Sequence, residues 1–161
     1  MLVSVDVDIC IKQSAPDVLL EALAGTHKKA FEVLEQKGWS AVDIRTVLEG
    51  QGGLAVIAKQ GDDVSGFALF RHVLDEAELI TLAVDPACQR KGIARQLLDA
   101  GIGYLSKQAC TSIFLEVRSD NRPAIILYER HGFIRSGLRK GYYKTEKGIR
   151  LDALMFSRRL A

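Results

Sequence analysis

The stretch from Leu82 to Asp99 constrains the fold more than any other part of the sequence. It is typical of a strand that ends near Pro86, a loop with two cations and Gly92, and then a helix. The apolar residues of that helix recur at helical spacing, at Ile93, Leu97 and Leu98. The first N–H groups of a helix lack partners and carry partial positive charge, and glycine lets a ligand approach the main chain. The stretch therefore predicts a phosphate-binding loop between a strand and a helix.

Length and composition favour a single domain over residues 1–161. Of the 161 residues, 48% are hydrophobic and 26% are charged, as in an ordinary globular protein with a sizeable core. We expect a cytoplasmic protein without membrane contact, because no apolar run is long enough for a membrane helix and no signal-peptide pattern is visible. The three cysteines are widely spaced and the three histidines are isolated, so we expect free thiols and no metal site.

Positive charge is concentrated at the C-terminal end of the sequence. Residues 131–161 contain eight Lys and Arg but only two Asp and Glu, although the net charge of the whole chain is +2. This segment is either a solvated basic surface or a basic rim that helps to hold an anionic cofactor or an RNA-associated substrate. Charge alone does not decide between the two interpretations.

The apolar periodicity predicts an α/β sheet with helices on both faces. The predicted strands are Leu2–Lys12, Leu54–Lys59, Val64–Val73, Glu78–Val84, Ser112–Arg118, Phe133–Leu138 and Arg150–Arg159. The predicted helices are a short one from Val18 that Gly25 ends, His27–Lys37, Val42–Leu48 after a capping box at Ser40 and Asp43, Ile93–Lys107, and one from Asn121 to Gly132. The basic, aromatic segment Arg139–Gly148 is expected to join the last two strands.

Several motifs together resemble the GCN5-related N-acetyltransferase (GNAT) family. Gln89 to Ala94 matches the family signature Q/R-x-x-G-x-G/A, with alanine in place of the third glycine. Further matches follow in the family's order, at Leu115–Arg118, Asn121, Leu127–Glu129, Gly132-Phe133, Gly141–Tyr143 and Asp152-Ala153. The resemblance is dense from Glu78 to Phe156 and is strongest to the RimI-type ribosomal-protein-alanine N-acetyltransferases. It implies the GNAT fold, a mixed, mostly antiparallel twisted sheet of six to seven strands flanked by about four helices.

The resemblance implies an acetyl-CoA site along the opening stretch. The N–H groups from Arg90 to Ala94 would bind the pyrophosphate, and the strand before them would pair with the pantetheine amides. The N–H of Val84 would polarise the thioester carbonyl. The cofactor-binding residues implied in this way are Leu82, Ala83, Val84, Gln89, Arg90, Lys91, Gly92, Ile93, Ala94, Asn121 and Tyr128.

The resemblance also implies two catalytic residues for direct transfer. An α-amino group is mostly protonated at pH 7, so its attack on a thioester requires a base. The family's glutamate base, which acts through water, falls on Glu116, and its tyrosine acid falls on Tyr128. Cys88 suggests a covalent acetyl-cysteine route, but the sequence supplies no base beside it, so direct transfer is the expected mechanism.

The expected acceptor is the N-terminal α-amino group of a protein, such as a ribosomal protein. Trp39, Tyr142 and Tyr143 are the candidate contacts to the acceptor peptide. We expect a monomer or weak dimer and no direct nucleic-acid binding. Two alternatives stay open at this point, a small-molecule amine N-acetyltransferase and a non-catalytic acyl-CoA-binding module.

Overall fold

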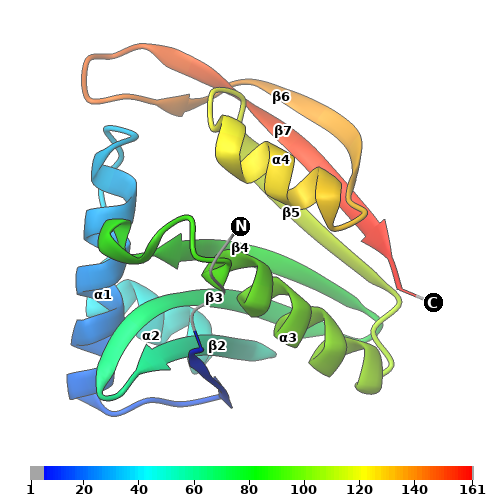
Figure 1. Cartoon of the computed structure of the whole chain (residues 1–161). Coiled ribbons are helices and arrows are strands. Elements are labelled where there is room, and N and C mark those ends of the chain that lie inside the picture. The colour runs from blue at the N-terminus through cyan, green and yellow to red at the C-terminus, as the bar shows by residue number, and fades with distance from the viewer. Residues whose placement is uncertain (1–5, 161) are drawn as a thin grey trace.

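One sheet and four α-helices make up the described part of the chain, residues 6–160 of the computed structural model (Figure 1). In chain order the elements are β1 (Asp8–Lys12), α1 (Asp17–Glu32), α2 (Ala41–Leu48), β2 (Gly53–Gln60), β3 (Asp63–Val73), β4 (Glu76–Val84), the 3₁₀ turn η1 (Pro86–Cys88), α3 (Ile93–Lys107), β5 (Ser112–Arg118), α4 (Arg122–Arg130), β6 (Ile134–Lys144) and β7 (Arg150–Arg159). The seven strands lie in the order β1-β2-β3-β4-β5-β7-β6. This agrees with the predicted mixed sheet flanked by helices.

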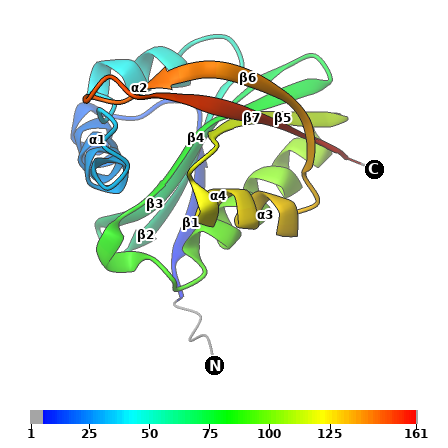
Figure 2. The same cartoon turned by 90° about the horizontal axis from the view of Figure 1, so that it is seen from above.

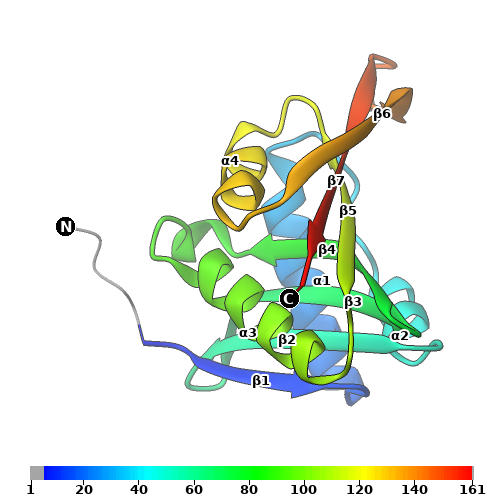
Figure 3. The same ribbon diagram turned by 90° about the vertical axis from the view of Figure 1, so that its right-hand side faces the viewer.

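The parallel pair β4–β5 divides the sheet into two parts. Every other neighbouring pair is antiparallel. The pairing of β4 with β5 runs only from Glu76 opposite Ser112 to Leu79 opposite Leu115. Beyond that point the two strands diverge, as Figure 3 shows from the side. The last residues of β4 therefore keep β3 as a partner but have none on β5, which opens a gap in the sheet.

Two hydrophobic cores cover opposite faces of β2, β3 and β4. The pair α1 and α2 packs on one face, and α3 lies on the other with α4 beside it (Figure 2). The first core is centred on Leu20, Leu23, Ile44, Leu48, Phe67 and Leu69, and the second on Phe70, Ile93, Leu97, Leu98, Ile113 and Phe156. No residue of β5, β6 or β7 belongs to the core under α1 and α2. That face of the three strands is left open, and Phe114 on it is 40% exposed.

Strongly periodic segments have the predicted bounds. The structure places α3, β5 and β7 over the predicted residues, and Ser40 and Asp43 form the predicted capping box of α2. Of the predicted first strand Leu2–Lys12, β1 covers Asp8–Lys12, and residues 2–5 lie outside the described part of the chain.

Two predictions about local structure were wrong. Gly25 does not end a helix, because α1 continues from Asp17 to Glu32 and buries Leu23 and His27 on either side of the glycine. Packing of this face outweighs the roughly 1 kcal/mol that a glycine costs inside a helix. The segment after Leu138 is not a link, because β6 continues to Lys144 and pairs with β7 as far as Arg150.

Candidate active site

The loop before α3 has the backbone geometry of an anion site. Gly92 adopts φ 79°, in the left-handed region, and a Cβ added there would meet nothing within 4 Å. No side chain caps the N-terminus of α3, so the N–H groups of its first turn remain available to a ligand. Arg90 and Lys91 stand next to this turn. The predicted residues Gln89 to Ala94 therefore lie together around an accessible helix N-terminus.

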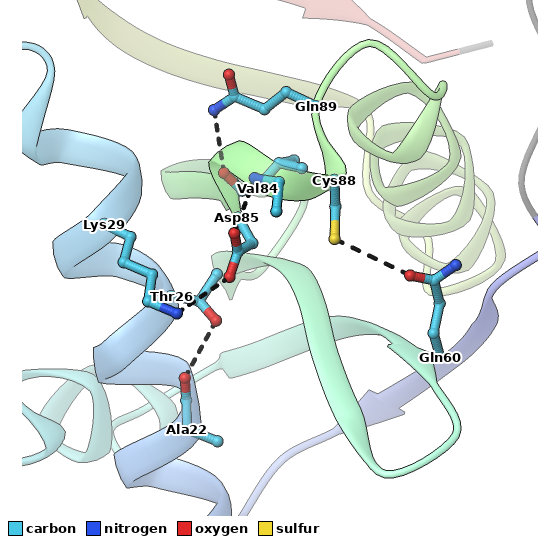
Figure 4. A network of polar contacts seen from close by, with 9 residues as sticks. Ala22, Thr26, Lys29, Gln60, Val84, Asp85, Cys88 and Gln89 are labelled. Atoms are coloured by element: carbon cyan, nitrogen blue, oxygen red, sulfur yellow. Dashed lines mark hydrogen bonds and ion pairs between the residues drawn. The ribbon is translucent and has the colours of Figure 1, made fainter.

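Internal hydrogen bonds hold this loop against β4. Asp85 accepts a hydrogen bond from the N–H of Ala87 at 2.9 Å, and the Gln89 amide donates to the carbonyl of Val84 at 3.1 Å. Figure 4 shows the Gln89 contact, together with Cys88, whose Sγ points toward Gln60 Oε1 at 3.9 Å. An amide cannot act as a base, so Cys88 has no activating partner in this contact.

The gap between β4 and β5 leads from this loop into the sheet. Leu82, Ala83 and Val84 lie on the part of β4 that has no partner on β5. Apart from the Val84 carbonyl, which accepts the Gln89 hydrogen bond, the backbone groups on that side can bind an extended amide chain. Asn121, on the other side, caps α4 by accepting a hydrogen bond from the N–H of Ala124 at 3.4 Å. These residues and the uncapped helix suit acetyl-CoA, which is an elongated and negatively charged molecule.

Glu116 lies on the open face of β5. Its side chain is 22% exposed, and its Oε1 is 2.9 Å from Arg139 Nε of β6. Both residues line a small cavity of about 200 Å³ with Glu78, Phe114, Ser136 and Met155. The Arg139 guanidinium also lies over the Tyr142 ring, with Cζ 5.4 Å from the centroid. Sequence reasoning missed Arg139 because it interpreted the segment as a basic surface, a basic rim or a link, and gave this arginine no separate role.

Tyr128 lies in α4, on the opposite face of the sheet from Glu116. Its side chain is 7% exposed and packs edge to face against Phe133, with ring centroids 5.9 Å apart. No hydrogen bond to its hydroxyl is present within residues 6–160. Among those residues, the one fully enclosed side-chain polar atom without a partner is His72 Nε2, so the Tyr128 hydroxyl keeps contact with solvent. Burial raises the pKa of Tyr128 well above its usual value, and the charge of Tyr143 adds to the shift.

Tyr143 connects the surroundings of Glu116 and Tyr128. Burial, followed by the negative charge of Glu116, raises the pKa of Tyr143 to about 12. The Tyr142 ring is exposed and meets the Tyr143 ring edge to face, with centroids 5.2 Å apart. Both predicted acceptor contacts on β6 therefore lie near the predicted base, Tyr143 through the charge of Glu116 and Tyr142 through Arg139.

Trp39 lies in the loop between α1 and α2 and is held by His27. Its backbone N–H donates to His27 Nδ1 at 3.0 Å, and the two rings stack with centroids 5.5 Å apart. Trp39 also lines a surface groove of about 740 Å³, together with residues of α1 and Glu146 of the β6–β7 loop. The ion pair of Glu35 with Lys147, at 3.5 Å, joins the same two loops. The groove does not include Tyr142 or Tyr143, so the three predicted acceptor contacts do not form one wall.

Two buried residues that sequence reasoning gave no role fix the loop that carries Trp39. Arg118, 6% exposed, donates to both carboxylate oxygens of Asp120 at 2.9 and 2.7 Å and to the carbonyl of Leu34 at 2.6 Å. His27 Nε2 is 3.0 Å from Thr81 Oγ1 of β4. Because Nδ1 accepts the Trp39 N–H, Nε2 carries the proton and donates to Thr81. The loop is thus tied to both strands that border the gap.

The buried position of His27 determines its charge. Desolvation lowers its pKa to about 4, against a smaller opposing effect of Asp43. The imidazole is therefore neutral near pH 7, as its acceptor role at Nδ1 requires. The contacts of His27 with Thr81 and of Arg118 with the Leu34 carbonyl join residues 54 and 84 positions apart, so no local pattern indicates them.

Comparisons with known proteins agree with this geometry. The family model for the Acetyltransferase (GNAT) family matches residues 20–133. The chain belongs to this family and is an N-acetyltransferase, a class whose members use acetyl-CoA.

Its relatives include enzymes named for one acceptor. It is 40% identical over 109 residues to the ribosomal protein bS18-alanine N-acetyltransferase of Escherichia coli K12, covering 68% of this chain and 73% of that protein. The protein of the same name from Haemophilus influenzae is 31% identical over 142 residues, or 87% of this chain and 97% of that one. The crystal structure of the E. coli ribosomal-protein-S18-alanine N-acetyltransferase superposes with a TM-score of 0.83 at 33% identity, covering 96% and 95% of the two chains.

Residues 6–160 contain neither a metal-binding cluster nor a membrane-spanning helix. No group of three or more His, Cys, Asp or Glu side chains is arranged to hold a metal ion there. None of the helices in that range combines the length and hydropathy needed to cross a membrane.

Proposed function

We propose that this N-acetyltransferase acetylates the N-terminal α-amino group of a protein, with a ribosomal protein that begins with alanine as the acceptor. The observation that supports this proposal most strongly is the gap between β4 and β5. Glu116 lies on one face of the sheet at this gap, and Tyr128 lies on the other. The relatives that are 40% and 31% identical are named for this acceptor, which supports the same chemistry here.

The loop before α3 and the unpaired edge of β4 would bind acetyl-CoA, the acetyl donor. The uncapped N-terminus of α3, with Arg90 and Lys91 beside it, would bind the pyrophosphate of acetyl-CoA. The backbone from Leu82 to Val84 would pair with the pantetheine amides, and Asn121 lies on the facing side. The bound thioester supplies the acetyl group, and the protein orients it and polarises its carbonyl.

Glu116 and Tyr128 would then move the protons. Glu116 accepts a proton from the acceptor ammonium, directly or through a water, and the neutral nitrogen forms a bond to the acetyl carbon. The bond between that carbon and sulfur breaks, and Tyr128 protonates the sulfur that leaves. Tyr128 is protonated before each turnover, because burial raises its pKa above the usual value. The nitrogen loses its second proton to water as the amide forms, and solvent returns a proton to the Tyr128 oxygen and takes one from Glu116.

A thiol-release assay with acetyl-CoA and Ala-initiated peptides tests the proposal. Glu116→Gln should lower kcat by about 10²-fold or more, because general-base catalysis contributes on that scale. Tyr128→Phe should lower kcat while leaving the KM for acetyl-CoA unchanged. Glu129→Gln, at an exposed position of α4, is the matched control for lost charge. Normal turnover by Glu116→Gln would remove the base assignment.

A small polyamine is the second candidate acceptor, because the groove beside Trp39 is acidic. Its charged lining residues are Glu21, Glu32, Glu35, Glu146, Lys28 and Lys37. Four carboxylates against two ammonium groups attract a cation, whether it is a polyamine or a basic peptide. Spermidine and free lysine therefore belong in the same assay. Activity on spermidine without activity on any peptide would select the small-molecule alternative.

A further inference from the structure

His27 joins the loop that carries Trp39 to the diverging end of β4. Its Nδ1 accepts the Trp39 backbone N–H at 3.0 Å, and its Nε2 is 3.0 Å from Thr81 Oγ1. Thr81 lies beyond Leu79, where the pairing of β4 with β5 ends, and it directly precedes Leu82. One side chain therefore links the predicted acceptor loop to the strand that is predicted to bind the donor.

The ring of His27 is held in place by aromatic neighbours. His27 is 2% exposed, and its ring stacks on Phe31 with centroids 4.2 Å apart and on Trp39 with centroids 5.5 Å apart. The Phe67 ring of β3 lies 6.1 Å away. Because a closely packed ring has little freedom to turn, the hydrogen bond that it accepts fixes the position of the Trp39 backbone.

The loop between α1 and α2 lies on the same side of the sheet as Glu116. Arg118 follows Glu116 by two residues on β5, so the two side chains share a face of the strand. Arg118 donates to the Leu34 carbonyl at 2.6 Å and so holds the start of the loop. His27 holds its end, at Trp39. The loop therefore borders the face on which an acceptor would reach the predicted base.

Gly38 lets the same end of the loop lie close against α1. A Cβ at this position would be 2.6 Å from the Cα of Lys28, which is much shorter than an ordinary van der Waals contact. The backbone beside Trp39 thus lies directly on the helix residue that follows His27. A hydrogen bond and a close backbone approach together set the position of Trp39.

We propose that His27 is a positioning residue for the acceptor, because it holds the loop, through the Trp39 N–H, in the conformation that binds the peptide. The inference rests on the proposed function, in which the peptide passes this loop to reach Glu116. Without an acceptor at Nδ1 the loop would populate other conformations, and the apparent affinity for the peptide would fall with the fraction that stays competent. Saturating peptide would restore the competent loop, so kcat would not change.

Two substitutions of His27 separate its two hydrogen bonds. The amide oxygen of asparagine is as many bonds from the main chain as Nδ1 is, so it can accept the Trp39 N–H. The amide nitrogen of glutamine corresponds in the same way to Nε2, so it can donate to Thr81 but leaves no acceptor at the position of Nδ1. Both variants lose the ring, so the effect of lost packing is common to both.

Kinetics with acetyl-CoA and an Ala-initiated peptide should show the difference. For H27Q we expect the KM for the peptide to rise about fivefold, as for the loss of one hydrogen bond, with kcat and the KM for acetyl-CoA unchanged. H27N should stay within about twofold of the wild type, because it keeps that hydrogen bond. Destabilisation of the whole fold would instead lower the active fraction, and with it kcat, and leave both KM values unchanged.

Hydrogen–deuterium exchange measures the loop without any acceptor. In H27Q the amides of residues 33–40 should exchange faster than in the wild type, because the loop opens more often, and in H27N they should not. If H27Q does not fold, H27F, which keeps an aromatic ring but has no nitrogen, repeats both measurements.

The inference and the proposed function fail in different ways. An unchanged KM for the peptide in H27Q, or an equal rise in H27Q and H27N, would overturn the role of His27. Unchanged exchange of the loop in H27Q would do the same. A wild type that acetylates no peptide, with faster loop exchange in H27Q, would instead overturn the proposed function.

Discussion

Acidification should destabilise this protein through His27. In the unfolded chain this histidine takes up a proton as the pH falls below 6.5, but in the folded protein it does so only near pH 4. Between these values the unfolded state binds more protons, so stability rises with pH across the window and falls as the pH is lowered. A protonated ring would also lose the acceptor at Nδ1 that holds Trp39.

The size of the effect follows from the shift of the pKa. A change from 6.5 to about 4 corresponds to about 3 kcal/mol at about 1.4 kcal/mol per pKa unit. Between about pH 7.5 and about pH 5, about 2 kcal/mol of this should be lost. The loss is complete once the pH falls below the folded pKa.

Urea unfolding at both pH values measures the effect. The wild type should lose about 2 kcal/mol more free energy of unfolding than His27→Gln, which lacks the titrating group. Lys28→Gln, at the adjacent exposed position of α1, should behave as the wild type does. An equal pH dependence in the wild type and His27→Gln would refute the assignment of a neutral, buried His27.

Three substitutions test other parts of the structure. Arg118→Met leaves Asp120 and the Leu34 carbonyl without their partner, so the free energy of unfolding in urea should fall by about 2 kcal/mol. An unchanged free energy of unfolding would contradict a stabilising role for these Arg118 contacts. Gly101→Ala places a Cβ 2.6 Å from the Phe70 ring, so Tm should fall, with about 1–3 kcal/mol lost, and an unchanged Tm would count against this packing. Gly92→Ala strains a left-handed residue by about 1 kcal/mol and should raise the KM for acetyl-CoA several-fold without a large change in Tm; an unchanged KM would separate Gly92 from the donor site.

The local sequence pattern was sufficient to predict the bounds of a helix or strand where the segment has strong periodicity or a clear boundary signal. The apolar spacing from Ile93 to Lys107 and the alternation from Ser112 to Arg118 gave the observed bounds of α3 and β5. It failed where packing outweighs propensity, as at Gly25. It also failed where a strand is formed by pairing rather than by composition, as in β6, which is rich in polar and basic residues and pairs along one edge with β7.

The same limit applies to the candidate site. A loop signature and two motif residues were enough to predict the donor loop, Glu116 and Tyr128, because each lies within a short recognisable segment. The ion pair of Glu116 with Arg139 and the contact of His27 with Thr81 join residues far apart in the chain. Such contacts depend on the three-dimensional sheet order, and no local spacing predicts them.

The most direct test of the proposed function is the position of the acetyl group on a product. A peptide that begins with alanine and carries an internal lysine is incubated with acetyl-CoA and the wild type or Glu116→Gln, and the products are sequenced by mass spectrometry. The wild type should place one acetyl group on the α-nitrogen and leave the lysine free, and Glu116→Gln should give little product. Acetylation of the lysine alone, or equal product from both proteins, would contradict it.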